Sequence, residues 1–432
     1  MKKGIRIIIG MCCALLLVTS WTMAINRETT AEKQLRLIRQ ASLLMSDGIY
    51  IHAIVLLEEA ASYSGEHTFE AEEKLKTAYL ALMGNRGISR RYVVLLENQM
   101  GRANAQAEIF VEAANYYLSI PRITEALRVL REGIERTGCA ELTIIYESNR
   151  YAYETIRTSF DYIAAISEAT MQVRRDGLWG IASVTGNMII PCEHKHISTF
   201  NNGRAIAGNG SEIFAIDRNN NRIALFRGYA TAFGNLSENR IALMIDGTWR
   251  RATGELELGT IEFKQIGTYS GGFAAAQTGT GWGVVDLGIN WLVDPIYDGV
   301  VKDELGRSYA QGAVFMKSGN SVHLFVGGQY TGHTFEDARP FSAEGYAAVR
   351  QNGLWGFIDT DGNVVIDFKF DDALSFGQHL AAVEIDGLWG YISIIGQVVI
   401  APEYLEAKSF SNGSAPVRTQ RGWQIIRLLE YR

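Results

Sequence analysis

The sequence predicts two structured parts, a region of helical repeats followed by an all-β array of antiparallel repeats. Three observations predict this class. Between residues 29 and 159, apolar residues recur every three or four positions, the spacing of an amphipathic helix. From residue 160 onward, alternating apolar and polar residues are interrupted by Asp-Gly and Asn-Gly pairs, which favour two-residue β-hairpins. Finally, the motif Gly-Leu-Trp-Gly occurs three times, starting at Gly177, Gly353 and Gly387.

Composition limits the classes of function. The chain has 432 residues, of which 47% are hydrophobic, enough for more than one buried core. Its net charge is −6 and its basic residues form no stripe, so no nucleic-acid partner is expected, because binding phosphates needs clustered Lys and Arg. The sequence contains no Walker loop, nucleophile elbow or His-Glu-x-x-His motif. We therefore predict a protein that is not an enzyme and needs no cofactor.

The N-terminal segment, residues 1–25, has two interpretations. Three basic residues precede an uncharged run at residues 7–24. As a signal-anchor, this run has about the length that spans a bilayer, and its basic side would stay cytoplasmic. As a signal peptide, it would be cleaved after the small-x-small sequence Thr22-Met23-Ala24. Both interpretations place the bulk of the chain outside the cytoplasm, either membrane-anchored through residues 7–24 or secreted.

Residues 29–159 are expected to form paired helices. The pattern Ala-Ile-x-x-Leu-Glu-x-Ala from Ala53 returns as Ala-Leu-x-x-Leu-Arg-x-Gly from Ala126, 73 residues later, which is two periods of about 36. Such a period resembles the tetratricopeptide repeat, although the usual proline after the second helix is missing. The resemblance implies stacked helix pairs with a concave groove that often binds peptides. It is carried by Ala41, Gly48, Tyr50, Ala53 and Ala60.

Residues 160–432 are expected to form about eight units of about 34 residues. Six tryptophans each follow a glycine by one or two places, at spacings of 33 or 34 residues or of 70 and 73, which are two periods. In one unit a strand turns at Asn352-Gly353, returns through Trp355, and turns again into a third strand. Each unit is thus predicted to be a three-stranded meander. The motif residues are Gly177, Trp179, Gly180, Trp249, Trp282, Gly283, Gly353, Trp355, Gly356, Gly387, Trp389, Gly390 and Trp423.

The tryptophans are expected to join successive small sheets. Burying one such ring adds roughly 2–3 kcal/mol, and the adjacent glycine leaves room for a neighbouring backbone or ring. The chain also begins and ends in the middle of a unit, so its two ends can complete each other. This favours a closed, propeller-like ring, with an open β spiral as the alternative.

These units resemble the WG-repeat family, which is found mostly in bacteria. The resemblance rests on Gly-x-Trp-Gly, on Phe357-Ile358-Asp359, on a glycine before Val-Val-Ile, and on Pro-x-Tyr at Pro295 and Pro402. It covers residues 160–432, with departures at 201–233, 234–269 and 305–341. The family resemblance implies an interaction module and brings no established catalytic residues.

Other chemistry-bearing residues have plainer interpretations. His194-Lys195-His196 is the densest group of metal-capable side chains, but a metal site needs further ligands, so a polar loop is expected. The aspartates at 217, 286 and 359 recur with the period and are expected to cap turns. Tyr346, Tyr391 and Tyr404 are the candidate contact surface.

The function that follows is a membrane-tethered, extracytoplasmic interaction scaffold that binds an unidentified protein partner. The alternative is a module that binds cell-wall glycan or peptidoglycan, which would need rows of Trp or Tyr rings facing solvent. A third option is an enzyme whose site is assembled from loops of several units.

Overall fold

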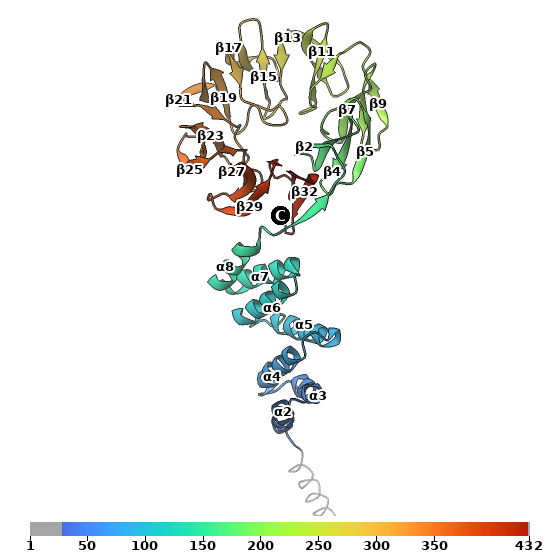
Figure 1. Cartoon of the computed structure of the whole chain (residues 1–432), viewed down its shortest axis with the longest axis vertical. Helices are drawn as coiled ribbons and strands as arrows, with labels where there is room; N and C mark the ends of the chain where they lie inside the picture. The colour runs from blue at the N-terminus through green and yellow to red at the C-terminus, as the bar shows by residue number, and fades with distance from the viewer. Residues whose placement is uncertain (1–27, 431–432) are drawn as a thin grey trace, which may run out of the picture. The chain divides into compact units, whose positions relative to one another are not determined.

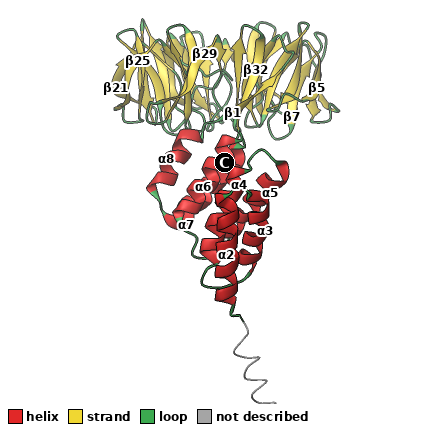
Figure 2. Cartoon of the chain, turned by 60° about the horizontal axis from the view of Figure 1, so that its bottom comes forward, coloured by secondary structure: helices red, strands yellow, loops and turns green. Residues whose placement is uncertain are grey.

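The structure is a computed structural model that describes residues 28–430. The chain divides into two compact units, the first ending at Glu147 and the second beginning at Ser148. Along the described residues, all helices precede all strands (Figures 1 and 2). The boundary expected at residue 159 lies beyond the first strand, β1 (Tyr153–Arg157), which belongs to the second unit.

The first unit consists of consecutive helices that pack against one another, with small residues where they meet. Ala41, Ala53 and Ala60 are fully buried, and Gly48 turns the chain between the first two helices with a φ of 74°. The two sequence-related segments from Ala53 and Ala126 both lie in helices, α3 and α7, and both face the core. The helical region is thus confirmed, while the tetratricopeptide likeness stays a prediction. The described helices are α2 (Thr30–Ser46), α3 (Tyr50–Ser62), α4 (Thr68–Ala81), α5 (Arg86–Met100), α6 (Ala107–Ser119), α7 (Ile123–Thr137) and α8 (Ala140–Asn149).

Local signals explain where these helices begin and end. The Thr29 hydroxyl accepts a hydrogen bond from the Glu32 amide at 3.2 Å, and the Glu32 carboxylate accepts one from the Thr29 amide at 2.9 Å. This capping box satisfies amides that otherwise lack partners at a helix start. At the other end of the unit, Gly138 stops α7 with a φ of 63°, a left-handed conformation that glycine adopts without strain.

The second unit is an eight-bladed β-propeller. Each blade is a four-stranded antiparallel sheet, with its first strand toward the centre of the ring and its fourth on the outside (Figure 1). Blades 1 to 4 are β2 (Tyr162–Ser167), β3 (Thr170–Arg175), β4 (Leu178–Ser183), β5 (Met188–His194); β6 (His196–Ile197), β7 (Arg204–Gly208), β8 (Ile213–Asp217), β9 (Arg222–Leu225); β10 (Ala232–Phe233), β11 (Arg240–Ile245), β12 (Thr248–Thr253), β13 (Leu258–Phe263); β14 (Gln265–Ile266), β15 (Phe273–Gln277), β16 (Trp282–Asp286), β17 (Trp291–Tyr297). Blades 5 to 8 are β18 (Gly299–Val300), β19 (Ala313–Ser318), β20 (Ser321–Val326), β21 (Gln329–Phe335); β22 (Asp337–Ala338), β23 (Ala347–Gln351), β24 (Leu354–Ile358), β25 (Val364–Phe370); β26 (Asp372–Ala373), β27 (Leu380–Ile385), β28 (Leu388–Ser393), β29 (Val398–Tyr404); β30 (Glu406–Ala407), β31 (Ser414–Thr419), β32 (Gly422–Leu428) with β1.

The prediction of three strands per unit is wrong, because each blade has a fourth, innermost strand. In seven of the eight blades this strand has only two residues, such as Asp372–Ala373 in blade 7. Two residues show no alternation, so the period-two signal of a strand cannot reveal them. The other three strands of a unit are present as expected.

The ring closes by joining the two ends of the second unit, and the open spiral is excluded. β1, at the start of the second unit, pairs along its whole length with β32, at its end. Blade 8 also packs against blade 1, because Trp423 and Ile425 share a buried core with Ile163 and Val173. A closed ring leaves no sheet face uncovered at its ends.

The blades meet through eight apolar cores, one between each pair of neighbours. In blade 6 the second strand buries Ala347, Ala348 and Val349 and exposes Arg350, whereas the fourth strand exposes four of its seven residues. The hairpin turns are of type I′ as predicted, since Asn352 and Gly353 have φ values of 53° and 81°. The Asp-Gly pairs at 176, 246 and 386 have the same two positive φ angles.

Candidate functional site

Each repeat tryptophan packs into the apolar core that its blade shares with the next one. Trp355, for example, lies among residues of blades 6 and 7, and Trp423 among residues of blades 8 and 1. Both are 4% exposed. The six rings divide evenly by exposure, with Trp282, Trp355 and Trp423 buried and Trp179, Trp249 and Trp389 partly buried.

The glycine after the tryptophan meets the backbone of the outermost strand. A Cβ at Gly390 would lie 2.6 Å from the Ile400 oxygen and 2.7 Å from the Pro402 nitrogen. The cause is a bulge, because the pairing of β28 with β29 shifts register between Trp389 and Tyr391. The motif therefore combines a ring that reaches the next blade with a glycine that accepts a bulged neighbour. The equivalent glycines 180, 283 and 356 are equally crowded.

The predicted tyrosine contact surface is wrong for two of its three members. Tyr391 is fully buried and donates a hydrogen bond to the Lys408 carbonyl at 2.9 Å. Tyr404 is 3% exposed and donates to the Tyr153 hydroxyl at 3.0 Å. Both rings point into the core between blades 7 and 8, because each follows the inward alternation of its strand. Tyr346 is partly buried and packs edge-on against Phe376.

The recurring aspartates cap turns. Asp359 Oδ1 accepts the amides of Asp361 and Asn363 at 3.0 and 2.8 Å, and its Oδ2 accepts the Asn363 side-chain amide at 3.0 Å. Burial acts to raise the pKa of Asp359, but the hydrogen bonds from Asn363 and from the Asp361 and Gly362 amides together outweigh it, so the net pKa is lowered. Each carboxylate is occupied by the bonds of its own turn. The aspartates at 217 and 286 are capped in the same way.

The two histidines considered as metal ligands do not form a site. His194 ends β5, is buried, and meets the Phe214 ring edge-on; burial lowers its pKa. His196 starts β6 and lies beside Phe233. Among residues 28–430 no group of three or more His, Cys, Asp or Glu side chains is placed to hold a metal ion.

One loop on the inner side of the ring differs from its counterparts. Between β18 and β19 the chain runs for twelve residues, 301–312, whereas the matching loops of blades 2, 3, 4, 7 and 8 have six. Asp303 folds this insertion, since its carboxylate accepts the amides of Leu305 and Arg307 and pairs with the Arg307 side chain at 2.6 Å. The insertion is therefore an ordered turn of the same Asx type as the repeat turns.

The insertion contacts the adjacent blade 4 and two blades, 3 and 8, that are not its neighbours in sequence. The Leu305 carbonyl accepts hydrogen bonds from Thr268 Oγ1 at 2.8 Å and from Asn235 Nδ2 at 3.2 Å. Thr268 follows the innermost strand of blade 4, and Asn235 follows that of blade 3. On the other side, Glu304 Oε1 lies 2.6 Å from Lys408 Nζ of blade 8. The insertion of blade 5 thus bridges blades 3, 4 and 8 across the inner side of the ring.

Burial and charge act against each other at the Glu304–Lys408 pair. Burial raises the pKa of the Glu304 carboxyl, and the attraction of Lys408 offsets it only in part. Burial acts to lower the pKa of Lys408, but the Glu304 carboxylate outweighs it and the net shift is upward. Nearby Lys302 has no carboxylate partner among the described residues, and burial lowers its pKa. Its ammonium group sits 4.0 Å from the centre of the Trp282 ring.

Cations cover the repeat tryptophans in several blades. The Arg339 guanidinium lies 4.3 Å from the Trp355 ring centre, and Lys408 Nζ lies 5.9 Å from that of Trp423. Ring faces carry negative potential and attract such groups. None of these basic residues was a predicted site residue. The only sequence signal was the interval of 73 residues between Trp282 and Trp355, which exceeds two repeats of about 34.

The predicted membrane segment, residues 7–24, lies outside the described residues. Within residues 28–430, none of the helices combines the length and the apolar character needed to cross a bilayer.

The chain is similar to several solved structures, and parts of it match one family model. The chain is similar to Kluyveromyces lactis Hsv2, with 10% identity over 63% of this chain and 97% of that one and a TM-score of 0.36. It is also similar to the β-propeller domain of Myceliophteria thermophila Cps50 (Swd1), with 9% identity over 63% and 98% and a TM-score of 0.34. No curated protein matches the sequence. The model described as "WG containing repeat" matches residues 179–211, 333–355, 355–389 and 389–423, and these stretches of the propeller are therefore WG-containing repeats.

Proposed function

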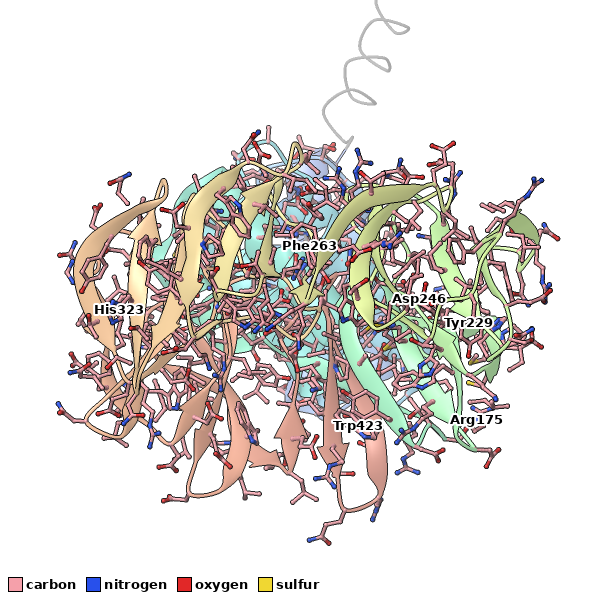
Figure 3. All side chains as sticks on the ribbon, turned by 90° about the horizontal axis from the view of Figure 1, so that it is seen from above. Arg175, Tyr229, Asp246, Phe263, His323 and Trp423 are labelled. Carbon is pink, nitrogen blue, oxygen red and sulfur yellow. The ribbon has the colours of Figure 1, made fainter. Side chains whose placement is uncertain are left out.

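We propose that this chain is a non-catalytic interaction scaffold whose propeller binds a protein partner. The observation that carries the proposal is an open groove of about 460 Å³, lined by both apolar and charged residues, between the outer parts of blades 2 and 3. Leu225 is 52% exposed and Tyr229 is 66% exposed, and Figure 3 shows Tyr229 on the light-green part of the ring. The apolar lining consists of Leu225, Phe226, Tyr229, Ile245, Leu256 and Leu258.

The groove has the properties of a docking place for an extended peptide segment. β9, at its edge, has four residues, whereas the fourth strands of blades 1, 4, 5, 6 and 7 have seven. It pairs only with β8, so its outer edge offers unpaired backbone groups to a further strand. Arg227 and Glu257 also line the groove and can select charges on the partner. The partner best suited is therefore a segment in strand conformation with alternating apolar side chains.

The proposal can be tested by using the full-length chain as bait to capture a protein partner. Leu225→Asp places a charge in the groove and should abolish capture of the partner that the wild-type chain retains. Ile395→Asp is the matched control, because Ile395 is 70% exposed in a turn of blade 7, and it should leave capture unchanged. Equal capture by both variants, each with an unchanged melting temperature, would count against the groove.

The glycan-binding alternative needs rings that face solvent. Trp179, Trp249 and Trp389 are only partly buried, but each joins an inter-blade core, which leaves little free ring face. Retention of the chain by purified cell wall in the absence of protein, together with loss of retention in Trp389→Phe, would favour this alternative.

The proposal includes a tether. We infer from residues 7–24 that the chain is held in a membrane with its bulk outside the cytoplasm, or is secreted after cleavage. Extraction of membranes with alkaline carbonate separates the cases: an anchored chain stays in the pellet, and a chain lacking residues 1–25 does not.

A further inference from the structure

Three blades place an arginine directly opposite the repeat tryptophan, and two of these arginines have a carboxylate partner. Arg350 lies 3.8 Å from a Glu336 oxygen and donates a hydrogen bond to the Gly353 carbonyl at 3.2 Å. Arg418 forms an ion pair with Glu406, which faces it from the innermost strand of blade 8. The three arginine–tryptophan pairs are Arg174 with Trp179, Arg350 with Trp355, and Arg418 with Trp423.

Arg174 is the exception. The position that Glu406 occupies in blade 8 is Tyr162 in blade 1, directly opposite Arg174. The guanidinium carbon of Arg174 lies 5.9 Å from the Tyr162 ring centre and 5.6 Å from that of Trp179. Among residues 28–430 no carboxylate pairs with Arg174, and its side chain is exposed. The Tyr162 ring thus takes the place of a carboxylate, and the N–H donors of the Arg174 guanidinium have no carboxylate to bind.

A second cation lies at the same ring. Lys408 Nζ is 5.8 Å from the Tyr162 ring centre, while one of its protons is directed to Glu304 at 2.6 Å. Tyr162 itself meets Trp179 and Trp423 edge-on, at 5.8 and 5.4 Å between ring centres. These contacts fix the phenol at the junction of blades 8 and 1, where Figure 3 shows Trp423 on the red strand next to the green strands of blade 1.

Two carboxylates of this region already have partners, since Glu304 is paired with Lys408 at 2.6 Å and Asp161 accepts a backbone amide. Asp161 precedes Tyr162, and its Oδ2 accepts the Asp176 amide at the hairpin turn at 2.7 Å. Asp161 has the same role as Asp371 in blade 7, which accepts the Asp386 amide at 2.8 Å.

We propose that the cluster of Arg174, Lys408 and Tyr162 binds a small oxyanion, a carboxylate or a phosphate, in the place where blade 8 has its own Glu406 carboxylate. A guanidinium held on aromatic faces presents paired donors to such a group in a fixed orientation. Lys408 is paired with Glu304 but has further N–H donors, and Tyr162 contributes a hydroxyl donor. The site is independent of the groove between blades 2 and 3.

The test is calorimetric titration of the full-length chain with inorganic phosphate and, separately, with citrate, each against chloride at matched ionic strength. Arg174→Met keeps the stem that packs on the rings and removes the donors, and it should weaken binding by about tenfold or more. Arg350→Met is the matched control and should bind as the wild type does, because Arg350 is already paired. Binding of phosphate alone assigns a phosphate ligand, and binding of citrate alone assigns a carboxylate.

Two substitutions of Tyr162 test the same site without changing Arg174. Tyr162→Glu restores the internal carboxylate of blade 8 and should abolish the heat of binding. Tyr162→Phe keeps the packing and removes only the hydroxyl, and it should weaken binding by a few fold. Wild-type heats no larger than those of chloride, or equal affinities in Arg174→Met and Arg350→Met, would overturn the proposal.

Discussion

Glu304 and Lys408 form an ion pair of 2.6 Å between blades 5 and 8, which are three blades apart in the ring. The two side chains are 28% and 16% exposed, so part of the hydration of each charge is lost. The Leu305 carbonyl of the same insertion, residues 301–312, accepts hydrogen bonds from blades 3 and 4. The insertion of blade 5 therefore connects three other blades. The insertion thus links blade 5 to blades 3 and 8, in addition to the contacts between neighbouring blades.

Lys408→Met is expected to lower the free energy of unfolding by about 1–3 kcal/mol at pH 7, because it leaves the Glu304 carboxylate partly buried without a partner. The loss should depend on pH. The pKa of Glu304 is already raised in the folded chain and rises further without the lysine, so the folded variant holds the proton more tightly than the unfolded chain does. Its stability relative to the wild type should therefore fall as pH rises from about 4.

Chemical denaturation at pH 4 and pH 7 checks this pH dependence. Arg421→Met is the control, because Arg421 is exposed and only its backbone amide has a described bond, and its effect should be small at both pH values. A deficit in Lys408→Met that is the same at pH 4 and pH 7 would show that Glu304 does not titrate against the lysine.

The sequence predicted the repeating part of this fold well, because turns and strand alternation depend on residues that are close together in the sequence. The Asp-Gly and Asn-Gly turns and the return strand with its tryptophan predicted the repeating unit. The incomplete unit at each end favoured a closed ring over an open spiral. The innermost strands were missed because two residues, such as Asp372 and Ala373, carry no periodicity. The tyrosines were misplaced because inward and outward positions alternate along a strand, and the sequence alone does not show which of the two faces the neighbouring blade.

The candidate sites could not be predicted in the same way. Glu304 and Lys408 are 104 residues apart, and only closure of the ring brings them together. That Arg174 lacks a carboxylate partner is seen by comparing equivalent positions of two blades. Tyr162 in blade 1 occupies the position that Glu406 occupies in blade 8. That comparison needs the register of the innermost strands, which the sequence does not show.

Gly390→Ala is expected to cost about 2–3 kcal/mol, because its methyl group would overlap the Ile400 oxygen and the backbone of the bulged strand cannot move without losing its pairing. Gly387→Asn is the matched change in the same hairpin, where the structure leaves open space and a φ of 77° that Asn tolerates. It should cost less than about 1 kcal/mol. Thermal unfolding of the two variants decides between a steric requirement at the motif glycine and a general intolerance of the hairpin.

The closing strand can be tested with fragments of the second unit. A fragment of residues 148–432 retains β1, whereas one of residues 160–432 lacks it and exposes the edge of β32. The shorter fragment also loses the bond from the Leu429 amide to the Ala152 carbonyl at 2.9 Å. We expect its melting temperature to be lower by about 5–10 °C, and its free edge to promote association in solution. Equal melting temperatures would mean that β1 does not close the ring.

Tryptophan fluorescence tests the role of the motif rings. Trp355 is 4% exposed within the core between blades 6 and 7, so its emission should be blue-shifted and resist quenching by acrylamide. Trp389 is only partly buried and should be quenched more readily. Trp355→Phe is therefore expected to raise the quenchable fraction of the remaining emission, and Trp389→Phe to lower it. The opposite order would place the Trp355 ring in contact with solvent, and a row of such rings is the feature that glycan binding requires.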